Sequence, residues 1–545
     1  MSAVLPLAVV PVVLPLLSAA ALLLATDVQR RLGSLLNILA TLAGLLVAVA
    51  LLLRVDDGGS AAIAVHLTSN WAAPYGIPLV ADRLSALMLV VVGVVALGAA
   101  LYASAGWYRV GTYFYPLFQI LLMGVNGAFL TGDLFNLFVF FEVMLAASYG
   151  LQLHGSGRVR VRAGMHYIAV NLLASSLFLI GLAVLYGVLG SLSMADVAAK
   201  APLVADADRG LLHVGVVMLA MAFLVKAAVW PLNAWLVPAY TATSIPVAAL
   251  FVVMTKVGLY AILRLWTLLF PADAAASAQF GGGALLVGGF ATIAFGTMGV
   301  LASIRLDRVA AFSVIVSSGT LLAAFATGSP GVAAAALYYL VGATLAASAL
   351  FMLGELAKRT SAQGQAPEIE DIPDEDDNLD DDALPLVGRA YPVSVAALAF
   401  AYFACALVVA GLPPLAGFVA KAALLVALLH DMAAPGASGF AWSAGLVGLI
   451  VVSGLFATVS LARAGIRHFW SKGGRLPLRL KPGEGGALLV LLLACVWLTV
   501  SAEPALRYAR ATARDLHAPR AYIEAVLGAR PRPGPATPAA GGDAP

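Results

Sequence analysis

Long apolar runs dominate this sequence of 545 residues. A helix needs about 20 mostly apolar residues to cross the roughly 30 Å hydrocarbon layer of a bilayer. In lipid, only a structure that satisfies its own backbone hydrogen bonds can span the membrane. We therefore expect an all-α polytopic membrane protein with about fourteen transmembrane helices, close to residues 5–24, 35–53, 79–102, 113–130, 133–153, 164–190, 212–240, 247–269, 281–304, 309–327, 331–356, 393–430, 441–465 and 486–502.

The composition excludes the common classes of soluble protein. Charged residues make up 11% of the chain, whereas a soluble domain averages about 25%. The net charge of +3 is too small to indicate binding to nucleic acid. The only cysteines, Cys405 and Cys495, lie in apolar runs, and no two histidines form an HxxxH or HxH pair. We expect no disulfide, metal site or cofactor in this chain.

The expected helices fall into four parts along the chain. Helices 1–3 occupy residues 1–112, helices 4–8 residues 113–269 and helices 9–13 residues 281–465, and a last helix with a flexible tail occupies residues 486–545. The third part contains an acidic loop at 361–385. A dense run of like charges is typical of a solvated loop, and a docking surface for a basic partner is the alternative.

The basic residues of the loops predict the orientation in the membrane. The first apolar run is followed, not preceded, by arginines (Arg30 and Arg31), so we interpret it as a retained helix and not as a cleaved signal. Most lysines and arginines of the short loops then fall on one side, which the positive-inside rule assigns to the cytoplasm. The arginines after residue 502 fall on the other side and count against this orientation, but a tail carries less weight than the loops between helices. Both termini are therefore expected to be periplasmic.

Four ionisable residues lie well inside apolar runs: Glu142, Lys226, Lys256 and Lys421. Each costs about 2.5–3.5 kcal/mol at the centre of a membrane helix, so such residues mark function by default. A buried Glu–Lys pair that only clips helices together is the alternative, although one acid faces three lysines here. Burial lowers the pKa of a lysine and raises that of a glutamate, and a nearby opposite charge does the reverse. Our hypothesis is that Glu142 and Lys226 form a proton switch, and that Lys256 and Lys421 continue the path through water.

Prolines interrupt two of the expected helices. Pro231 frees the carbonyl of Ala227, next to Lys226, and Pro413 and Pro414 free the carbonyls of Val409 and Ala410. Irregular backbone at membrane depth is tolerated only where protein buries it or water lines it. Breaks at corresponding positions of two halves are the mark of inverted-repeat transporters. Helices 4–8 and 9–13 are therefore predicted to be two such repeats, with broken helices 7 and 12.

Other polar residues in the apolar runs are weaker signals. We interpret Asn126, Asn136, Asn171 and His166 mainly as partners in interhelical hydrogen bonds, with His166 as a secondary candidate for lining the proton path. Arg264 and Glu355 lie near the ends of spans, where their side chains are expected to reach towards the interface. Asp133 is expected to be a solvated cap.

Four stretches resemble the proton-pumping antiporter-like subunits: TGDLFNLFVFFEVMLAASYGLQLHG, FLVKAAVWPLNAWLVPAY, TKVGLYAILRL and GLPPLAGFVAKAALL. This superfamily includes membrane-arm subunits of respiratory complex I and of Mrp-type (Mnh, Sha or Pha) multisubunit Na⁺/H⁺ antiporters, and the D-type subunit of the latter is the best likeness. The resemblance covers about residues 75–470. It implies fourteen core helices, two inverted five-helix repeats and discontinuous helices 7 and 12.

The resemblance also assigns roles to individual residues. Glu142 matches the fifth-helix glutamate of the family, Lys226 the seventh-helix lysine, Lys256 the eighth-helix basic residue and Lys421 the twelfth-helix lysine. Relatives often carry a histidine or lysine in helix 11, but LYYLVGATLAAS has neither. Hydroxyl groups and water would have to conduct there, and the candidates for lining this part of the path are Tyr338, Tyr339, Thr344 and Ser348.

The resemblance implies a subunit of a Na⁺ (or K⁺ or Li⁺)/H⁺ antiporter in a bacterial inner membrane, acting with the other Mrp subunits in pH homeostasis. The residues themselves imply only intramembrane proton chemistry. Two alternatives remain open. In the first, the chain is a proton-pumping membrane-arm subunit of a complex I-like NADH:quinone oxidoreductase or of a membrane-bound hydrogenase. In the second, it is a scaffold that conducts no ions.

Overall fold

The computed structural model describes residues 7–24, 30–57, 63–68, 70–106, 113–362, 393–433, 440–470 and 480–531. Its helices are α1 (Val10–Leu24), α2 (Arg30–Asp57), α3 (Arg83–Ser104), α4 (Phe114–Leu130), α5 (Leu134–Leu153), α6 (Arg158–Leu189), α7 (Met194–Lys200), α8 (Asp206–Lys226), α9 (Leu236–Ala242), α10 (Ile245–Leu269), α11 (Gly282–Ala302), α12 (Leu306–Ala326), α13 (Pro330–Ala362), α14 (Val393–Ala410), α15 (Ala416–Ala433), α16 (Phe440–Gly465), α17 (Pro482–Val500), α18 (Ala502–His517) and α19 (Arg520–Leu527). A hairpin of β1 (Ala64–Leu67) and β2 (Pro78–Ala81) precedes α3.

The all-α membrane fold is confirmed. Thirteen of the helices are long and apolar enough to cross a membrane, and α1 and α4 are shorter apolar helices. These are fifteen apolar helices. Because α14 and α15 are two halves of one interrupted helix, they correspond to the expected fourteen crossings within the described residues. The acidic residues of the 361–385 segment lie outside the described residues.

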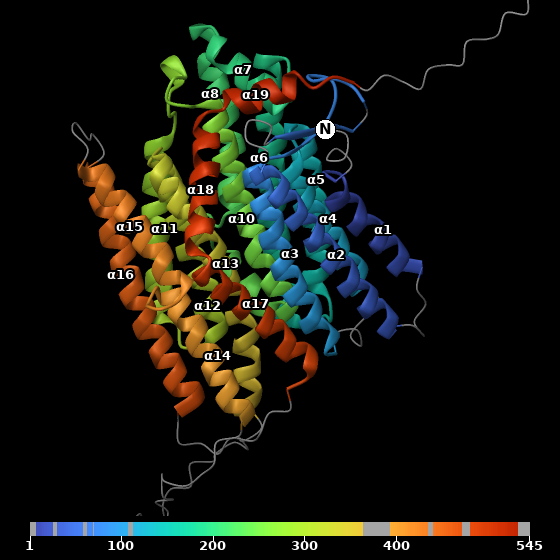
Figure 1. Ribbon diagram of the computed structural model, residues 1–545, viewed down its shortest axis with the longest axis vertical. Coiled ribbons are helices and arrows are strands. Elements are labelled where there is room, and N and C mark those ends of the chain that lie inside the picture. The colour runs from blue at the N-terminus through green and yellow to red at the C-terminus, as the bar shows by residue number, and fades with distance from the viewer. Residues whose placement is uncertain are drawn as a thin grey trace, which may run out of the picture.

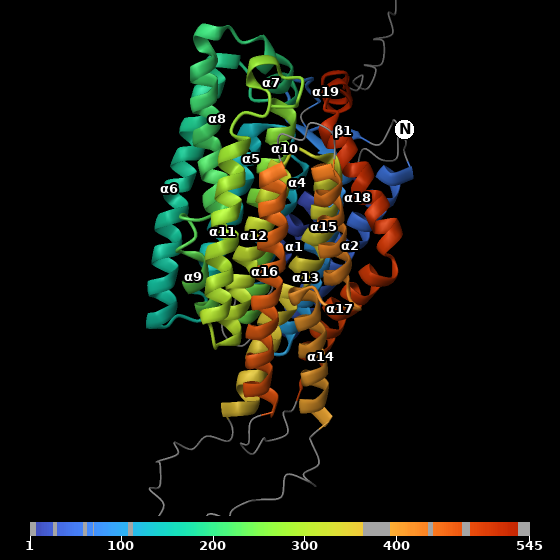
Figure 2. The ribbon, with the colours of Figure 1, turned by 90° about the vertical axis from the view of Figure 1, so that its left-hand side faces the viewer.

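Helix α10 forms the centre of the bundle (Figures 1 and 2). Every residue of this helix from Pro246 to Leu269 is buried, and it packs against α3, α8, α12 and α13. A helix that is apolar all round needs such complete cover. Polar groups on α10 are therefore surrounded by protein, and each needs a hydrogen-bond partner within it.

Both predicted interruptions are present at the prolines. Helix α8 ends at Lys226 and α9 begins at Leu236, with Pro231 between them. Helix α14 ends at Ala410 and α15 begins at Ala416, with Pro413 and Pro414 between them. Proline lacks the amide that would continue the hydrogen-bond ladder, so each helix stops where the sequence indicated.

The C-terminal segment differs from the expected flexible tail. Residues 502–527 form α18 and α19, and α18 lies along α13, α10 and α3. Its buried residues are Tyr508, Ala509, Thr512, Ala513 and Leu516, which follow the three-to-four-residue spacing of an amphipathic helix. That spacing was the available signal, but the arginines between these positions lower the mean hydropathy and conceal it. Figure 1 shows α19 and the N-terminus at the same end of the bundle, and residues 532–545 lie outside the described part.

The start of the third span also differs from the expectation. A helix was predicted from residue 79, but Pro78–Ala81 pairs as a strand with Ala64–Leu67. Helix α3 begins only after Asp82, whose carboxylate accepts a hydrogen bond from the Ser85 amide while the Ser85 hydroxyl accepts one from the Asp82 amide. This capping box fixes the first turn of the helix.

Candidate functional site

Lys226 lies at the last position of α8, beside the interruption. Its side chain is buried, and its Nζ donates a hydrogen bond to Asn171 Oδ1 of α6 at 2.6 Å. Gly258 of α10 allows the two helices to approach this closely. A Cβ atom at Gly258 would lie 2.7 Å from the Phe223 carbonyl oxygen and 3.0 Å from Lys226 Cβ. The central helix is therefore in direct contact with the lysine-bearing end of α8.

Glu142 is joined to the same part of α6. Its carboxylate accepts a hydrogen bond from the Ser175 hydroxyl, and Ser175 is one helical turn after Asn171. No ion pair within 4.0 Å joins the described side chains of Glu142 and Lys226. Each is hydrogen-bonded to a side chain of α6 instead, Glu142 to Ser175 and Lys226 to Asn171. The sequence indicates Asn171 only as a general interhelical partner. It gives no signal for Ser175, because serine is common in apolar helices.

Lys256 lies on α10 and is fully buried. Its Nζ donates a hydrogen bond to Ser317 Oγ of α12 at 2.9 Å. Ser317 in turn lines a small cavity of about 30 Å³, which is large enough for about one or two water molecules. The lysine therefore reaches a polar space through a single hydroxyl group.

The same cavity extends to Lys421. Its polar lining consists of Thr297, Ser313, Ser317, Tyr339, Ser453 and Lys421. These residues come from α11, α12, α13, α15 and α16, so only the tertiary structure brings them together. Lys256 and Lys421 are thus connected through Ser317 and a cavity that hydroxyl groups line. Of the four hydroxyl residues predicted on helix 11, Tyr339 is at this cavity.

Lys421 also contacts the end of the other broken helix. Its Nζ donates hydrogen bonds to the carbonyl oxygens of Ala410 at 2.7 Å and Val409 at 3.4 Å. These are the two carbonyls that the sequence predicted to be freed by the prolines. Gly411 follows with a φ of +80°, and a Cβ atom there would lie 2.4 Å from Lys421 Cδ. A positive φ and this close approach both require glycine.

The other candidates for path lining have different partners. The Tyr338 hydroxyl donates to the Leu498 carbonyl at 2.8 Å, and Ser348 donates to the Ala249 carbonyl at 3.1 Å. Thr344 donates to the Leu340 carbonyl of its own helix at 2.6 Å. His166 is exposed on α6, where it lines a surface pocket. None of these four residues lines the cavity between the lysines.

The first interruption is held by bonds that the sequence did not reveal. The Trp230 amide donates to Thr292 Oγ1 of α11 at 2.9 Å, and the Trp235 indole donates to the Val225 carbonyl at 3.1 Å. Freed backbone groups at membrane depth need such partners. Among the described residues, no group of three or more histidine, cysteine or acidic side chains is arranged to hold a metal ion.

Comparison with known proteins identifies the family. Residues 131–448 match the family model described as "NADH:quinone oxidoreductase/Mrp antiporter, TM". The chain belongs to this family. It is 47% identical over 97% of its length to a probable K⁺/H⁺ antiporter D-type subunit of Rhizobium meliloti, of which 98% is covered. It is 33% identical over 95% of its length to the Na⁺/H⁺ antiporter D-type subunit of Bacillus subtilis, of which 99% is covered.

A solved structure of the same family shares the whole fold. A chain of the Mrp complex from Dietzia sp. superposes with a TM-score of 0.81 at 28% identity, over 97% of this chain and 100% of that one. The resemblance to the D-type subunit of Mrp antiporters is therefore confirmed. Helices that precede and follow the family model, including α1–α3 and α17, are part of the shared fold.

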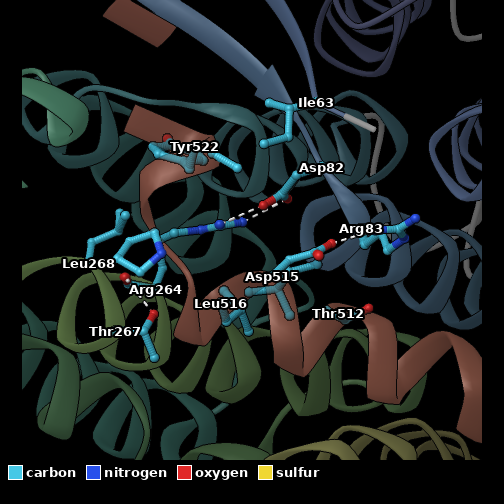
Figure 3. A pocket seen from close by; sticks show the side chains of 13 residues that line it. Ile63, Asp82, Arg83, Arg264, Thr267, Leu268, Thr512, Asp515, Leu516 and Tyr522 are labelled. Carbon is cyan, nitrogen blue, oxygen red and sulfur yellow. Dashed lines mark hydrogen bonds and ion pairs between the residues drawn. The ribbon is translucent and has the colours of Figure 1, made fainter. Parts of the chain in front are cut away.

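Arg264 corrects a prediction about the end of α10. A snorkelling side chain was expected, but Arg264 is buried and pairs with Asp82, with Nη1 and Oδ2 2.5 Å apart (Figure 3). Its guanidinium also lies over the rings of Tyr260 and Tyr522, 5.5 and 5.3 Å from their centroids. The position is near a helix end in sequence, yet α3 and α19 cover it. Glu355, in contrast, is partly exposed and lies 3.8 Å from Arg359.

The remaining polar predictions are partly right. Asn126 donates an interhelical hydrogen bond from α4 to the Pro11 carbonyl of α1 at 2.8 Å, as expected. Asn136, in the first turn of α5, donates to the hydroxyl of Thr131 at the end of α4, close by in the sequence. Asp133 caps α5 by accepting from the Asn136 amide at 2.8 Å, but it is buried and not solvated.

Proposed function

We propose that this chain is the proton-conducting subunit of a multisubunit antiporter that exchanges a monovalent cation for protons across a bacterial membrane. The observation that carries the proposal is two groups of ionisable residues inside the bundle, of which Lys226 and Lys256 are buried and Glu142 and Lys421 are partly buried. Glu142 and Lys226 share one turn of α6, and Lys256 and Lys421 share a cavity lined by hydroxyl groups. Intramembrane charges in contact with polar groups are typical of ion and proton pathways. The names of the two antiporter relatives agree with this function.

In this proposal the lysines hold and release the proton. Lys226 binds it beside Asn171, and the negative charge of Glu142 nearby stabilises the charged form. A shift of α5 that moves Glu142 away from Lys226 would favour release. Lys256 would receive the proton and pass it through Ser317 to water in the cavity. Lys421 would take it at the far side, where the two free carbonyls of α14 stabilise its charge as they would any cation at a helix C-terminus.

The proposal includes the orientation and the assembly. The described termini are at one end of the bundle, and we assign this end to the periplasm because the basic ends of α6, α12 and α13 lie at the other. We assign residues 113–269 and 281–465 to the two inverted repeats, each with one interruption next to a functional lysine. The other subunits of an Mrp complex are the expected partners, as the relatives are named antiporter subunits.

The test is cation-driven proton movement by the purified complex. The tagged complex is isolated in mild detergent, its partner chains are identified by mass, and it is reconstituted into vesicles that contain a pH-sensitive dye. We expect a KCl or NaCl pulse to move protons in the absence of NADH and quinone. K⁺ is to be tested first, because the relative at 47% identity is named for K⁺ and the one at 33% for Na⁺. Choline chloride is the matched control.

The same preparation discriminates the alternatives. A complex I-like or hydrogenase arm would co-purify with large peripheral chains and show flavin and iron–sulfur absorbance. Proton movement would then depend on an electron donor and not on the cation. A complex that exchanges cations normally while this chain carries Glu142→Gln would instead favour a scaffold role. Either result would contradict the proposal.

Two adjacent tyrosines provide a matched test of the cavity between the lysines. Tyr339→Phe removes a hydroxyl from the cavity, whereas Tyr338→Phe removes a hydroxyl that binds the Leu498 carbonyl outside it. Loss of one proton-relay group typically slows transfer by about 10²–10⁴-fold. We expect slowing towards the low end of this range for Tyr339→Phe, since Ser313 and Ser317 remain, and no change for Tyr338→Phe. Equal transport rates in the two variants would remove Tyr339 from the path.

A further inference from the structure

A large pocket opens at the end of the bundle opposite the termini. It has a volume of about 660 Å³ and lies between the start of α6, the short helix α9 and the start of α12. Figure 2 shows α9 beside the lower end of α6. The volume falls within the range of about 300–1,000 Å³ that is usual for small-molecule sites. None of the residues proposed above to carry protons, Glu142 and the three lysines, lines it.

Four arginines give the pocket a strong positive charge. Arg158 and Arg162 are one turn apart on α6 and so lie on one helix face. Arg305 directly precedes α12, and Arg308 is in the first turn of that helix. Arg305 is bonded to Asp307 at 2.6 Å, and Lys358 shares that carboxylate at 2.7 Å. The side chains of Arg158, Arg162 and Arg308 form no hydrogen bond or ion pair with other described residues.

The placement of these arginines is unfavourable without an anion. The N-terminus of a helix carries a partial positive charge, so cations in the first turn are repelled and anions are attracted. Arg158 is the first residue of α6, and Arg308 is in the first turn of α12. At the start of α12, Asp307 already supplies a carboxylate to Arg305 and to the Arg308 amide. An anion in the pocket would offset the repulsion among Arg158, Arg162 and Arg308 and the repulsion by the N-terminus of α6. Phosphate is one of the anions whose oxygens match the forked donors of arginine in a bidentate geometry.

The surroundings indicate that the phosphate belongs to a lipid. Val237 and Pro238 of α9 form an apolar wall of the pocket. On the outer surface of α6, Val159 and Met165 are exposed next to the arginines, and Leu172 and Leu173 continue the exposed apolar surface further along the helix. Charged groups at the membrane surface with apolar groups below them match a headgroup with its acyl chains.

We propose that this pocket binds the phosphate headgroup of an anionic phospholipid of the phosphatidylglycerol or cardiolipin class. Its occupant would contact α9, the half-helix that follows Lys226 and the first interruption. Arg160 already ties α6 to this half-helix by donating to the Ala242 carbonyl at 3.0 Å. A bound lipid would brace α9 between α6 and α12, so the lipid composition would set the transport rate. The binding itself does not depend on which ions are transported.

The test counts the lipid retained by the purified complex. The delipidated complex is titrated with phosphatidylglycerol, cardiolipin or phosphatidylcholine in detergent, and bound lipid is measured by native mass spectrometry. We expect both anionic lipids to bind in preference to phosphatidylcholine. The triple variant Arg158→Gln/Arg162→Gln/Arg308→Gln should lose affinity for them by about a hundredfold, since each arginine near a membrane surface contributes about fivefold. The matched control is Arg507→Gln/Arg510→Gln/Arg514→Gln, which alters three exposed arginines on α18.

Each outcome decides the proposal. Equal lipid binding by the two triple variants, with both complexes intact by size, would overturn it. Displacement of the lipid by millimolar inorganic phosphate would identify free phosphate as the ligand and overturn the lipid assignment. Binding by the isolated chain but not by the assembled complex would overturn it too, because a partner chain would then cover the pocket. Because the readout is bound lipid, a failure here leaves the ion-exchange assay unaffected, and the reverse also holds.

Discussion

Replacing Lys226 by alanine should abolish cation-driven proton movement while leaving the protein inserted and assembled. The substitution removes the ammonium group that donates to Asn171 Oδ1 at 2.6 Å, and with it the group that binds and releases the proton beside Glu142. Asparagine and serine cannot take over this role because neither titrates in the physiological range. The measurement is the cation-pulse assay on reconstituted complex, and the expected signal is that of empty vesicles.

An arginine at position 226 distinguishes a lysine that transfers protons from one whose charge only holds helices together. Lys226→Arg keeps a positive charge for Glu142 and Asn171, but a guanidinium stays protonated in proteins. The proposed switch therefore predicts assembly at the wild-type level with no transport. Normal transport by Lys226→Arg would show that the charge only holds helices together. Lys200→Ala, which alters a partly exposed lysine paired with Asp196, is the control and should transport normally.

Replacing Asp82 by asparagine should lower the free energy of unfolding by about 3–5 kcal/mol, the usual cost of leaving one member of a buried ion pair without its partner. Asparagine can still cap α3, so the loss isolates the charge. Arg264 would remain buried among Tyr260, Tyr522 and α3 with no carboxylate to bind. Figure 3 shows Arg264 between Asp82 and Tyr522. Because Arg264 is on α10, the central helix should loosen first. The measurement is equilibrium unfolding of the purified chain in detergent, followed by tryptophan fluorescence.

The stability that the Asp82–Arg264 pair contributes should depend on pH. Burial by itself would raise the pKa of Asp82, but Arg264 and the hydrogen bonds from Ser85 outweigh it and hold the pKa below the usual value. A lowered pKa contributes stability that is present above the unfolded-state value of about 3.9 and is lost as pH falls further. The difference between wild type and Asp82→Asn should thus be constant near neutrality and shrink below about pH 4.

A neighbouring ion pair, which lines a pocket together with Asp82 and Arg264, provides the control for Asp82 (Figure 3). Asp515 of α18 binds Arg83 at 2.6 Å, but its carboxylate is half exposed. Exposed ion pairs contribute about 0–1 kcal/mol, so Asp515→Asn should have little effect on unfolding. If both variants lost the same small amount, the Asp82–Arg264 pair would be no more than a surface contact, in conflict with its burial.

Much of the fold follows from the sequence. The length of the apolar runs predicts the crossings, since lipid leaves a backbone few other choices, and the prolines predict both interruptions because they cannot continue the helical hydrogen bonds. The pattern of apolar residues gave the wrong structure for two segments whose sequence was compatible with more than one structure. Residues 502–517 carry a buried stripe between arginines, and residues 78–81 are apolar enough for a helix but pair as a strand. Only the neighbours of these segments decide their structure.

The sequence by itself determined which residues carry charge into the membrane and where two helices must break. A buried charge is expensive in lipid, and a proline removes an amide wherever it occurs, so both signals are local and independent of the fold. The tertiary structure alone decided the partners. Lys226 meets Asn171, Lys256 meets Ser317, and Lys421 meets the carbonyls of α14, while Arg264 is buried against Asp82, 182 residues away along the chain. Hydrogen bonds between distant helices depend on how those helices pack, and no spacing along one helix encodes that.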